Sequence, residues 1–264
     1  MPAIRSVRST LAGLGLLAAG LVGVAAPSPA AAAEFSAAQK AEMGGVIRDY
    51  LIQNPEVLQD AMAALEQRQK TQEQAKRQQA VDSKSAELFS APSDVVLGNP
   101  KGKVTLVEFF DYNCGYCKRS LDDIAKLLKT EPDLRLVLKD FPVLGPGSVE
   151  AAYIASAARN QFKGEQFWQY HAKLLGGQHG PVGKAQALQV AKEMGANMDQ
   201  LAKDAGSAEV KTSIQSTMAL ADALSLTGTP SFVVGKDVVV GAVGYDELKD
   251  HVDNVLKCGK AVCS

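Results

Sequence analysis

The stretch KVTLVEFFDYNCGYC, residues 103–117, decides the fold of this chain. Residues 103–110 form a nearly continuous apolar run, which is typical of a central strand buried on both faces. Residues 118–129 follow with apolar side chains at helical spacing. The order strand, Cys-x-x-Cys turn and helix predicts an α/β domain organised around this junction.

The two cysteines of this turn favour redox chemistry. Cys114 falls at the predicted helix start, where free N–H groups and the helix dipole stabilise a thiolate. Cys117 lies one turn further on, shielded and able to resolve a mixed disulfide. The alternative is half of a zinc site, which needs a complementary pair of ligands. Cys258 and Cys263 are distant and more widely spaced, and the histidines are scattered: His171, His179 and His251.

The composition and charge of the chain exclude several classes of protein. The chain has 264 residues, 46% of them hydrophobic, which suits one or two domains with a substantial core. With 28 Lys and Arg against 29 Asp and Glu, the net charge of −1 gives no electrostatic footprint for nucleic acid. Ordinary Gly and Pro contents exclude a collagen-like or wholly disordered chain. Four cysteines are too few for a disulfide-dense small protein.

Residues 1–33 are predicted to be a signal peptide. Arg5 and Arg8 precede an apolar run at residues 11–26, and three alanines ending at Ala33 precede Glu34. The alternative is a membrane anchor, but the run is short for a spanning helix and is interrupted by glycines. We expect cleavage near Ala33 and export, which places the cysteines where disulfides persist. No other stretch is long enough to span a bilayer.

Residues 34–90 predict a helical arm. Two short apolar stripes at helical spacing are separated by Asn54 and Pro55, a candidate N-cap and first helical residue. Residues 66–79 are almost entirely polar, and a helix that is polar all round bridges space rather than covering a core. We favour an arm that self-associates, because the polar stalk holds the apolar stripes away from the body. The alternative is an arm that folds back on its own domain, which begins at about residue 91 and extends to residue 264.

The central motif resembles a known family. Glu108-Phe109-Phe110 followed by Cys114-Gly115-Tyr116-Cys117 is similar to the active-site strand and turn of DsbA-like thiol:disulfide oxidoreductases of the thioredoxin superfamily. Thr229-Pro230-Ser231-Phe232 resembles the family's cis-proline loop and leads into a predicted strand region at 233–240. The resemblance spans about residues 91–257. It implies a thioredoxin fold with a helical insertion at about residues 147–226, where four segments have helical periodicity: 150–158, 166–175, 185–194 and 210–226.

The sequence of the predicted arm resembles one subfamily in particular. IRDYL at residues 47–51 and NPEVL at residues 54–58 are similar to the N-terminal region of the ScsC subfamily. Those are periplasmic DsbA-like proteins linked to copper tolerance, several of which self-associate through this arm. The resemblance therefore implies a periplasmic location and a homo-oligomer formed through residues 34–90.

The resemblance also assigns roles. Cys114 is the expected nucleophile and Cys117 the resolving thiol. Glu108 lies where the family keeps a buried acid that relays a proton to or from Cys117. Its alternative role is a structural ion pair, with Lys139 on the strand predicted at residues 134–139 as the partner.

The residues around Cys114 indicate the direction of the reaction. Gly115 and Tyr116 carry no charge, whereas strong oxidases of the family place a histidine here, so we expect a less oxidising couple. The Gly-Tyr dipeptide and Thr229 resemble the DsbC-like isomerases. A cis Pro230 would expose the Thr229 backbone to a substrate peptide. The expected substrate contacts are therefore Gly115, Tyr116, Thr229 and Pro230. An ordinary turn is the alternative for Thr-Pro alone.

Cys258 and Cys263 have two interpretations. The first is a small structural disulfide at the C-terminus, and the second is a further redox or copper(I) site. Four cysteines allow three pairings, and we favour Cys114 with Cys117 and Cys258 with Cys263. We expect no cofactor and no metal site.

The leading functional prediction is a periplasmic disulfide isomerase or reductase. It would act on exported proteins, exchange electrons with a membrane redox partner and bind no nucleic acid. One alternative is a DsbA-like oxidase that donates disulfides. Another, from a different class, is a copper-binding or copper-buffering protein that uses its thiols as ligands.

Overall fold

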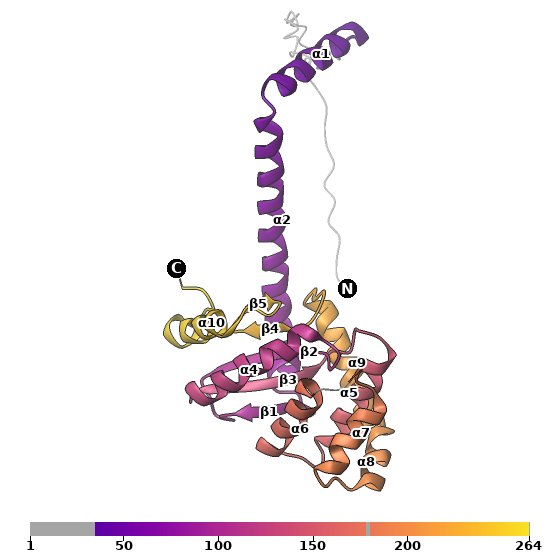
Figure 1. Ribbon diagram of the computed structural model, residues 1–264. Helices are drawn as coiled ribbons and strands as arrows, with labels where there is room; N and C mark the ends of the chain where they lie inside the picture. The colour runs from indigo at the N-terminus through magenta and orange to yellow at the C-terminus, as the bar shows by residue number, and fades with distance from the viewer. Residues whose placement is uncertain (1–34, 178–179, 264) are drawn as a thin grey trace, which may run out of the picture. The chain divides into compact units, whose positions relative to one another are not determined.

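The computed structural model describes residues 35–177 and 180–263 and divides the chain into two units, residues 1–59 and 60–264 (Figure 1). The predicted signal peptide and His179 lie outside the described residues. None of the helices in the described ranges combines the length and apolar character needed to cross a bilayer.

The first unit contains helix α1 (Ala37–Gln53), which is closed at both ends by side chains. Ser36 Oγ accepts from the Gln39 N–H at 3.2 Å, and Gln39 Oε1 accepts from the Ser36 N–H at 2.9 Å, forming a capping box. Asn54 ends the helix, since its backbone N–H and its Nδ2 both donate to the Tyr50 carbonyl. Asn54 is thus the C-cap of α1, where its amide donates to a carbonyl that the helix end leaves free, and its role as N-cap of the following helix stays a prediction. No α1 side chain is buried in the chain.

Helix α2 (Glu56–Ser83) runs from the first unit into the second. Every side chain from Leu58 to Lys76 is exposed, but the last turns are partly covered and Val81 is fully buried. The short helix α3 (Ser85–Phe89) follows and buries Leu88. The end of the segment predicted as an arm thus contributes to the core of the second unit.

The second unit is built on a five-stranded mixed sheet in the order β1-β3-β2-β4-β5 (Figure 1). β2 lies at the centre, parallel to β3 and antiparallel to β4, and β1 and β5 are antiparallel edge strands. The strong apolar run produces the buried central strand that the sequence predicts. The strands are β1 (Val95–Gly98), β2 (Val104–Phe110), β3 (Leu134–Asp140), β4 (Ser231–Val234) and β5 (Asp237–Val240).

The predicted strand region at residues 233–240 is a hairpin rather than one strand. β4 and β5 pair antiparallel around a turn at Gly235, whose φ of +59° favours glycine. A Cβ at this position would also lie 3.1 Å from Val255 Cγ2. Gly235, Lys236 and Asp237 interrupt the two valine runs, and a glycine followed by polar residues between apolar runs is the sequence signal of this hairpin.

Helices cover both faces of the sheet. α4 (Gly115–Thr130) and α10 (Tyr245–Cys258) pack against one face, and α3 and α9 (Ala208–Ala223) pack against the other. The predicted helical insertion lies between β3 and β4, and the thioredoxin-like fold is confirmed. Besides α9, the insertion contains α5 (Pro146–Ala158), α6 (Glu165–Gly176), α7 (Lys184–Glu193) and α8 (Met198–Ala205), of which the sequence analysis missed α8.

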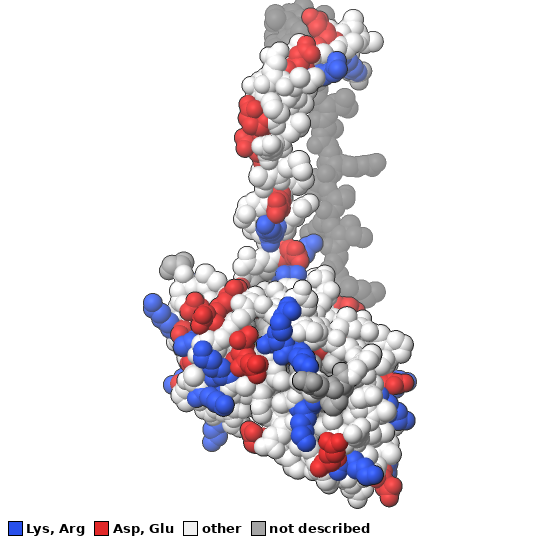
Figure 2. All heavy atoms as spheres, viewed as in Figure 1, with Lys and Arg blue, Asp and Glu red and all other residues white. Residues whose placement is uncertain are grey.

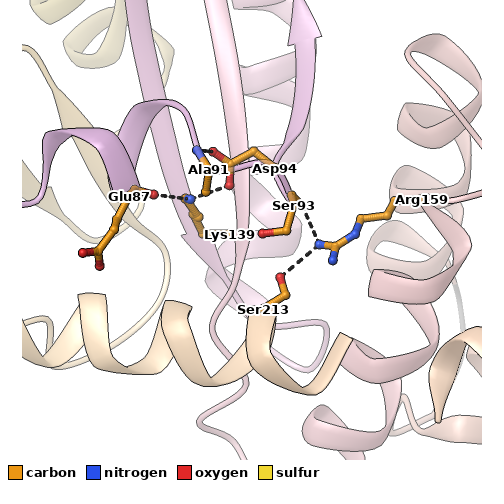
Figure 3. A network of polar contacts seen from close by, with 7 residues as sticks. All are labelled: Glu87, Ala91, Ser93, Asp94, Lys139, Arg159 and Ser213. Atoms are coloured by element: carbon orange, nitrogen blue, oxygen red, sulfur yellow. Dashed lines mark hydrogen bonds and ion pairs between the residues drawn. The ribbon is translucent and has the colours of Figure 1, made fainter. Parts of the chain in front are cut away.

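A buried polar network joins the entry of the chain into the sheet to the core (Figure 3). Lys139 of β3 forms an ion pair with Asp94, and both side chains are about 95% buried. Lys139 Nζ also donates to the Glu87 carbonyl at 2.7 Å, and the Ala91 N–H donates to Asp94 at 3.1 Å. The network thus fixes the segment between α3 and β1 against the middle of the sheet.

Arg159 extends this network to the insertion. Its Nη1 donates to the Ser93 carbonyl and to Ser213 Oγ of α9, at 2.5 and 3.1 Å. Figure 3 shows the guanidinium of Arg159 reaching from α5 towards both residues. Helices α5 and α9 are therefore tied to the same segment as β3.

Candidate active site

The candidate site lies where β2 ends and α4 begins. Cys114 is the N-cap of α4, and its Sγ accepts the Cys117 N–H at 3.2 Å. Cys114 is 5% exposed to solvent, whereas Cys117 is completely buried. The first thiol is thus the accessible member of the pair, at the end of the helix where amide groups stabilise negative charge.

Asp111 anchors the loop before the cysteines. One carboxylate oxygen accepts the Asn113 N–H at 2.8 Å. The other accepts the N–H groups of Val143 and Leu144 at 2.8 and 2.9 Å. One buried side chain therefore holds the active-site loop against the loop that follows β3.

Asn113 ties the same loop to the helical insertion. Its Nδ2 donates to Ser148 Oγ at 3.0 Å and to the Val182 carbonyl at 2.8 Å, while its Oδ1 accepts the Val182 N–H at 2.7 Å. The sequence analysis did not identify Asp111 or Asn113. The only signal was that both are polar residues directly before a Cys-x-x-Cys turn.

Beneath this loop, Tyr112 and His171 form a buried pair. Tyr112 Oη lies 3.3 Å from His171 Nδ1. Burial lowers the pKa of His171 to about 3, so the ring is neutral at ordinary pH. His171 also stacks on Trp168 and packs edge-on to Phe110. His171 therefore packs as a core residue between α6 and β2.

The Thr-Pro segment lies beside the first cysteine. The Thr229–Pro230 peptide bond is cis, and the Thr229 carbonyl oxygen lies 3.1 Å from Cys114 Sγ. Ser231 Oγ donates to the Gly228 carbonyl at 2.8 Å and steadies the turn. The fold thus brings together two segments that are 115 residues apart.

Gly115 and Tyr116 form the exposed edge of the site. A Cβ at Gly115 would meet no atom within 4 Å. Tyr116 is 58% exposed, with the Arg119 guanidinium 4.0 Å above its ring. Both residues therefore face the space that an approaching polypeptide would enter.

The two thiols have opposite proton affinities. The pKa of Cys114 is lowered to about 6, first by a hydrogen bond from the Cys117 thiol and further by hydrogen bonds from the Thr229 side chain and from the backbone amides of Cys117 and Tyr116. The same interaction with Cys114 raises the pKa of Cys117, and burial and the charge of Glu108 raise it further. At neutral pH Cys114 is thus the thiolate and Cys117 the thiol.

Glu108 lies on the face of the sheet that α4 covers. Burial, and then the charge of Cys114, raise its pKa to about 8. The alternative partner Lys139 is wrong: Lys139 pairs with Phe109 across the sheet and binds Asp94 instead. Because side chains alternate along a strand, Glu108 and Lys139 point to opposite faces.

The second cysteine pair lies at the end of α10. Cys258 and Cys263 are joined by a disulfide around Gly259, which ends the helix with a φ of +75°. The Ala261 carbonyl between them accepts from Asn254 Nδ2 at 3.0 Å. Within residues 35–177 and 180–263, no three His, Cys, Asp or Glu side chains gather into a group that could hold a metal ion.

A thioredoxin-like sheet, a Cys-x-x-Cys turn at the start of a helix and an adjacent cis-proline together define the site of a thiol:disulfide oxidoreductase. The family model of the DSBA-like thioredoxin domain matches residues 105–253, more than half of the chain. The protein therefore belongs to the DSBA-like thioredoxin domain family. The N-terminal domain of the copper resistance protein ScsC matches residues 39–72.

Solved structures agree with this family. A thioredoxin-like oxidoreductase from Silicibacter pomeroyi is 42% identical, with a TM-score of 0.62 over 66% of this chain and 98% of that one. ScsC from Proteus mirabilis, in a transitional conformation, is 29% identical, with a TM-score of 0.61 over 84% of this chain and 97% of that one.

A curated relative is much longer than this chain. The Na(+)/H(+) antiporter NhaA 1 of Salinispora arenicola is 30% identical over 62% of this chain, and the match spans only 25% of the antiporter.

Proposed function

We propose that the protein is a periplasmic disulfide isomerase or reductase that acts on exported proteins through Cys114 and Cys117. The observation that carries this proposal is the accessible Cys114 sulfur at the start of α4 beside the cis Thr229–Pro230 bond, a position that lowers its pKa to about 6. Reactive cysteines of this superfamily range from about 3.5 in a strong oxidase to about 7 in thioredoxin. A thiol with a pKa near the ambient pH is also the best attacking group in disulfide exchange.

The reaction begins at the accessible thiolate. Cys114 Sγ attacks one sulfur of a substrate disulfide, the S–S bond breaks, and the departing substrate thiolate takes up a proton. A mixed disulfide between Cys114 and the substrate remains. In isomerisation a second substrate thiolate attacks this bond, which forms a new substrate disulfide and releases Cys114 with no net transfer of electrons.

Reduction follows from the same intermediate. Cys117 loses its proton and attacks Cys114 Sγ, so the substrate leaves as a thiol and the enzyme pair becomes a disulfide. Burial raises the pKa of Glu108 to about 8, so a minor fraction is ionised at neutral pH; this carboxylate form accepts the Cys117 proton and returns it in the reverse direction. A membrane redox partner then supplies two electrons to restore the dithiol.

The approaching chain would pair with the loop beside Cys114. The Thr229 carbonyl lies 3.1 Å from Cys114 Sγ, within reach of a strand-like contact with a substrate peptide. Gly115, Tyr116 and Pro230 form the rest of this contact surface. Tyr116 offers an exposed aromatic ring for apolar substrate side chains.

Exposed apolar side chains on α1 and α2 support self-association. Met43, Val46, Ile47 and Tyr50 recur at helical spacing and are each more than one-third exposed, as is Met62 of α2. Such surfaces in water favour pairing with another apolar surface. An assembly would present several active sites to one misfolded client.

Refolding of a scrambled disulfide substrate tests the proposal. The reduced full chain should restore the activity of the scrambled substrate, and Cys114→Ser should abolish the effect, because the attacking sulfur is lost. Cys258→Ser/Cys263→Ser is the matched control and should retain it. A chain that oxidises a reduced substrate efficiently but fails to rearrange a scrambled one would instead be a DsbA-like oxidase.

Copper binding is a second candidate function, favoured by the match of residues 39–72 to a copper resistance protein. Thiolates are suitable ligands for copper(I). Copper(I) titration of the reduced chain and of Cys114→Ser distinguishes this role from catalysis. Tight stoichiometric binding that depends on Cys114, without rearrangement of substrates, would favour it.

A further inference from the structure

The loop that carries Thr229 is entered through an unusual backbone turn. Ser225 has a φ of +53° and is the only non-glycine residue in the described ranges with a positive φ. It directly follows the end of α9, where the Ser225 and Leu226 N–H groups donate back to Asp222 and Ala221. Glycine is the usual residue in this conformation, and a serine adopts it at a steric cost that a further contact of its backbone helps to offset.

Arg77 of α2 supplies such a contact. Its Nη2 donates to the Ser225 carbonyl at 3.2 Å and forms an ion pair with Glu73 at 2.6 Å, one helical turn earlier. The Arg77 side chain is only 19% exposed. The ion pair with Glu73 fixes the guanidinium, so its contact with the carbonyl is held in one geometry.

The same turns of α2 also hold the segment after the loop. Gln78 Nε2 donates to Asp237 Oδ1 at 3.1 Å, and Asp82 forms an ion pair with Lys236 at 2.8 Å. Both partners belong to the β4–β5 hairpin. The end of α2 thus contacts the chain on both sides of the Thr229–Pro230 bond.

Apolar packing completes this attachment. Val81 is buried in a cluster that joins the end of α9, the start of the loop and β4. Its members there include Leu220, Leu224, Leu226 and Val233.

We infer that residues 77–82 of α2, the α2 clamp, position the cis-proline loop, and that Arg77 is a positioning residue for substrate binding. Only three residues lie between Ser225, whose carbonyl Arg77 contacts, and Thr229, whose own carbonyl lies beside Cys114. The inference rests on the proposed substrate contact at Thr229. The clamp lies within residues 73–104, which neither family model covers.

Loss of the Arg77 contact should affect binding more than chemistry. Without it, Ser225 can leave its left-handed conformation and the loop occupies several positions. Only the fraction of molecules with a correctly placed Thr229 carbonyl then pairs with a substrate. The contact of Cys114 with the Cys117 N–H at the start of α4 does not involve the loop, so turnover of bound substrate should change little.

Steady-state kinetics of the full chain with a disulfide-containing peptide, and glutathione as the reductant, test this inference. Arg77→Ala should raise KM by about 3–10-fold, the factor that a hydrogen bond of ordinary strength represents, with kcat changed less than about twofold. Arg77→Lys keeps the charge and one donor, and should restore part of the loss. Lys76→Ala removes the same charge from an exposed neighbouring position and is the matched control, with KM unchanged.

Unchanged KM in Arg77→Ala, with Cys114→Ser inactive, would overturn the clamp and leave the proposed function intact. Activity that persists in Cys114→Ser would overturn the proposed function instead. If Arg77→Ala does not fold, Arg77→Gln takes its place, and an unchanged KM in that variant overturns the clamp equally.

Discussion

At the scale of single residues, two identical side chains acquire different chemistry from their positions on one helix. Cys114 at the N-cap accepts hydrogen bonds, which lowers its pKa, while Cys117 one turn later is buried beside Glu108, which raises its pKa. This division of roles follows from the spacing of three and is readable in the sequence. The contacts of Asp111 and Asn113 are not, because Val143, Val182 and Ser148 come from distant segments.

Glu108 should make stability depend on pH. Its pKa of about 8 lies above the value of about 4.3 for an unfolded glutamate, so the folded protein keeps a proton that the unfolded chain releases. The free energy of unfolding should therefore fall as pH rises from about 4.3 to about 8, by at most roughly 1.4 kcal/mol per pH unit. Glu108→Gln should remove this contribution.

Urea unfolding of the reduced protein between pH 5 and pH 8 measures the effect (roughly the window set by the two pKa values). The stability of Glu108→Gln relative to the wild type should increase steadily with pH. Glu56→Gln, at an exposed position of α2, is the control and should leave the pH dependence unchanged. Parallel curves for Glu108→Gln and the wild type would show that Glu108 is ionised throughout.

At the scale of elements, local sequence patterns located most helices, but they did not show which strands pair or which side chains meet. The helical segments of the insertion and the central strand follow from apolar spacing. The hairpin at Gly235 and the edge strand β1 were missed, because a short strand carries too few residues to show a period. The pairing of Lys139 with Asp94 rather than Glu108 depends on the sheet register, which local patterns do not fix.

The Lys139–Asp94 pair should be a large local contributor to stability. Lys139→Met should lower the free energy of unfolding by about 3–5 kcal/mol, because it leaves the Asp94 charge buried without its partner. The double variant Lys139→Met/Asp94→Leu should recover much of this loss, since no unpaired charge then remains.

An exposed pair provides the comparison for denaturant unfolding. Lys103 and Asp133 form an ion pair at 3.0 Å with side chains 73% and 38% exposed, so Lys103→Met should cost less than about 1 kcal/mol. Equal losses from Lys103→Met and Lys139→Met would contradict the importance of burial.

At the scale of the whole molecule, charge and apolar surface point to different properties. On the face drawn in Figure 2, described basic and acidic side chains are interspersed, in keeping with the net charge of −1. The large apolar side chains of α1 are exposed to solvent, and none of them is buried against the rest of the chain. Association through apolar surface is therefore a better-supported expectation than association through charge.

The solution mass should depend on α1. The signal-free full chain should sediment as an assembly, and Val46→Asp/Ile47→Asp should reduce it to single chains, because two charges enter the apolar surface. Arg48→Asp, on the opposite side of α1, is the control and should keep the assembled mass. A wild-type chain with the mass of one copy would contradict self-association through this helix.

The sequence by itself determined the central strand, the Cys-x-x-Cys turn at a helix start, four of the five insertion helices and the helical character of residues 37–83. These features depend on spacing along the chain, and local backbone geometry converts spacing directly into position. Only the tertiary structure decided that Thr229 meets Cys114, that Lys139 turns away from Glu108 and that Arg77 holds Ser225. Those contacts join residues far apart in the chain, so they depend on sheet register and helix docking, which no local pattern encodes.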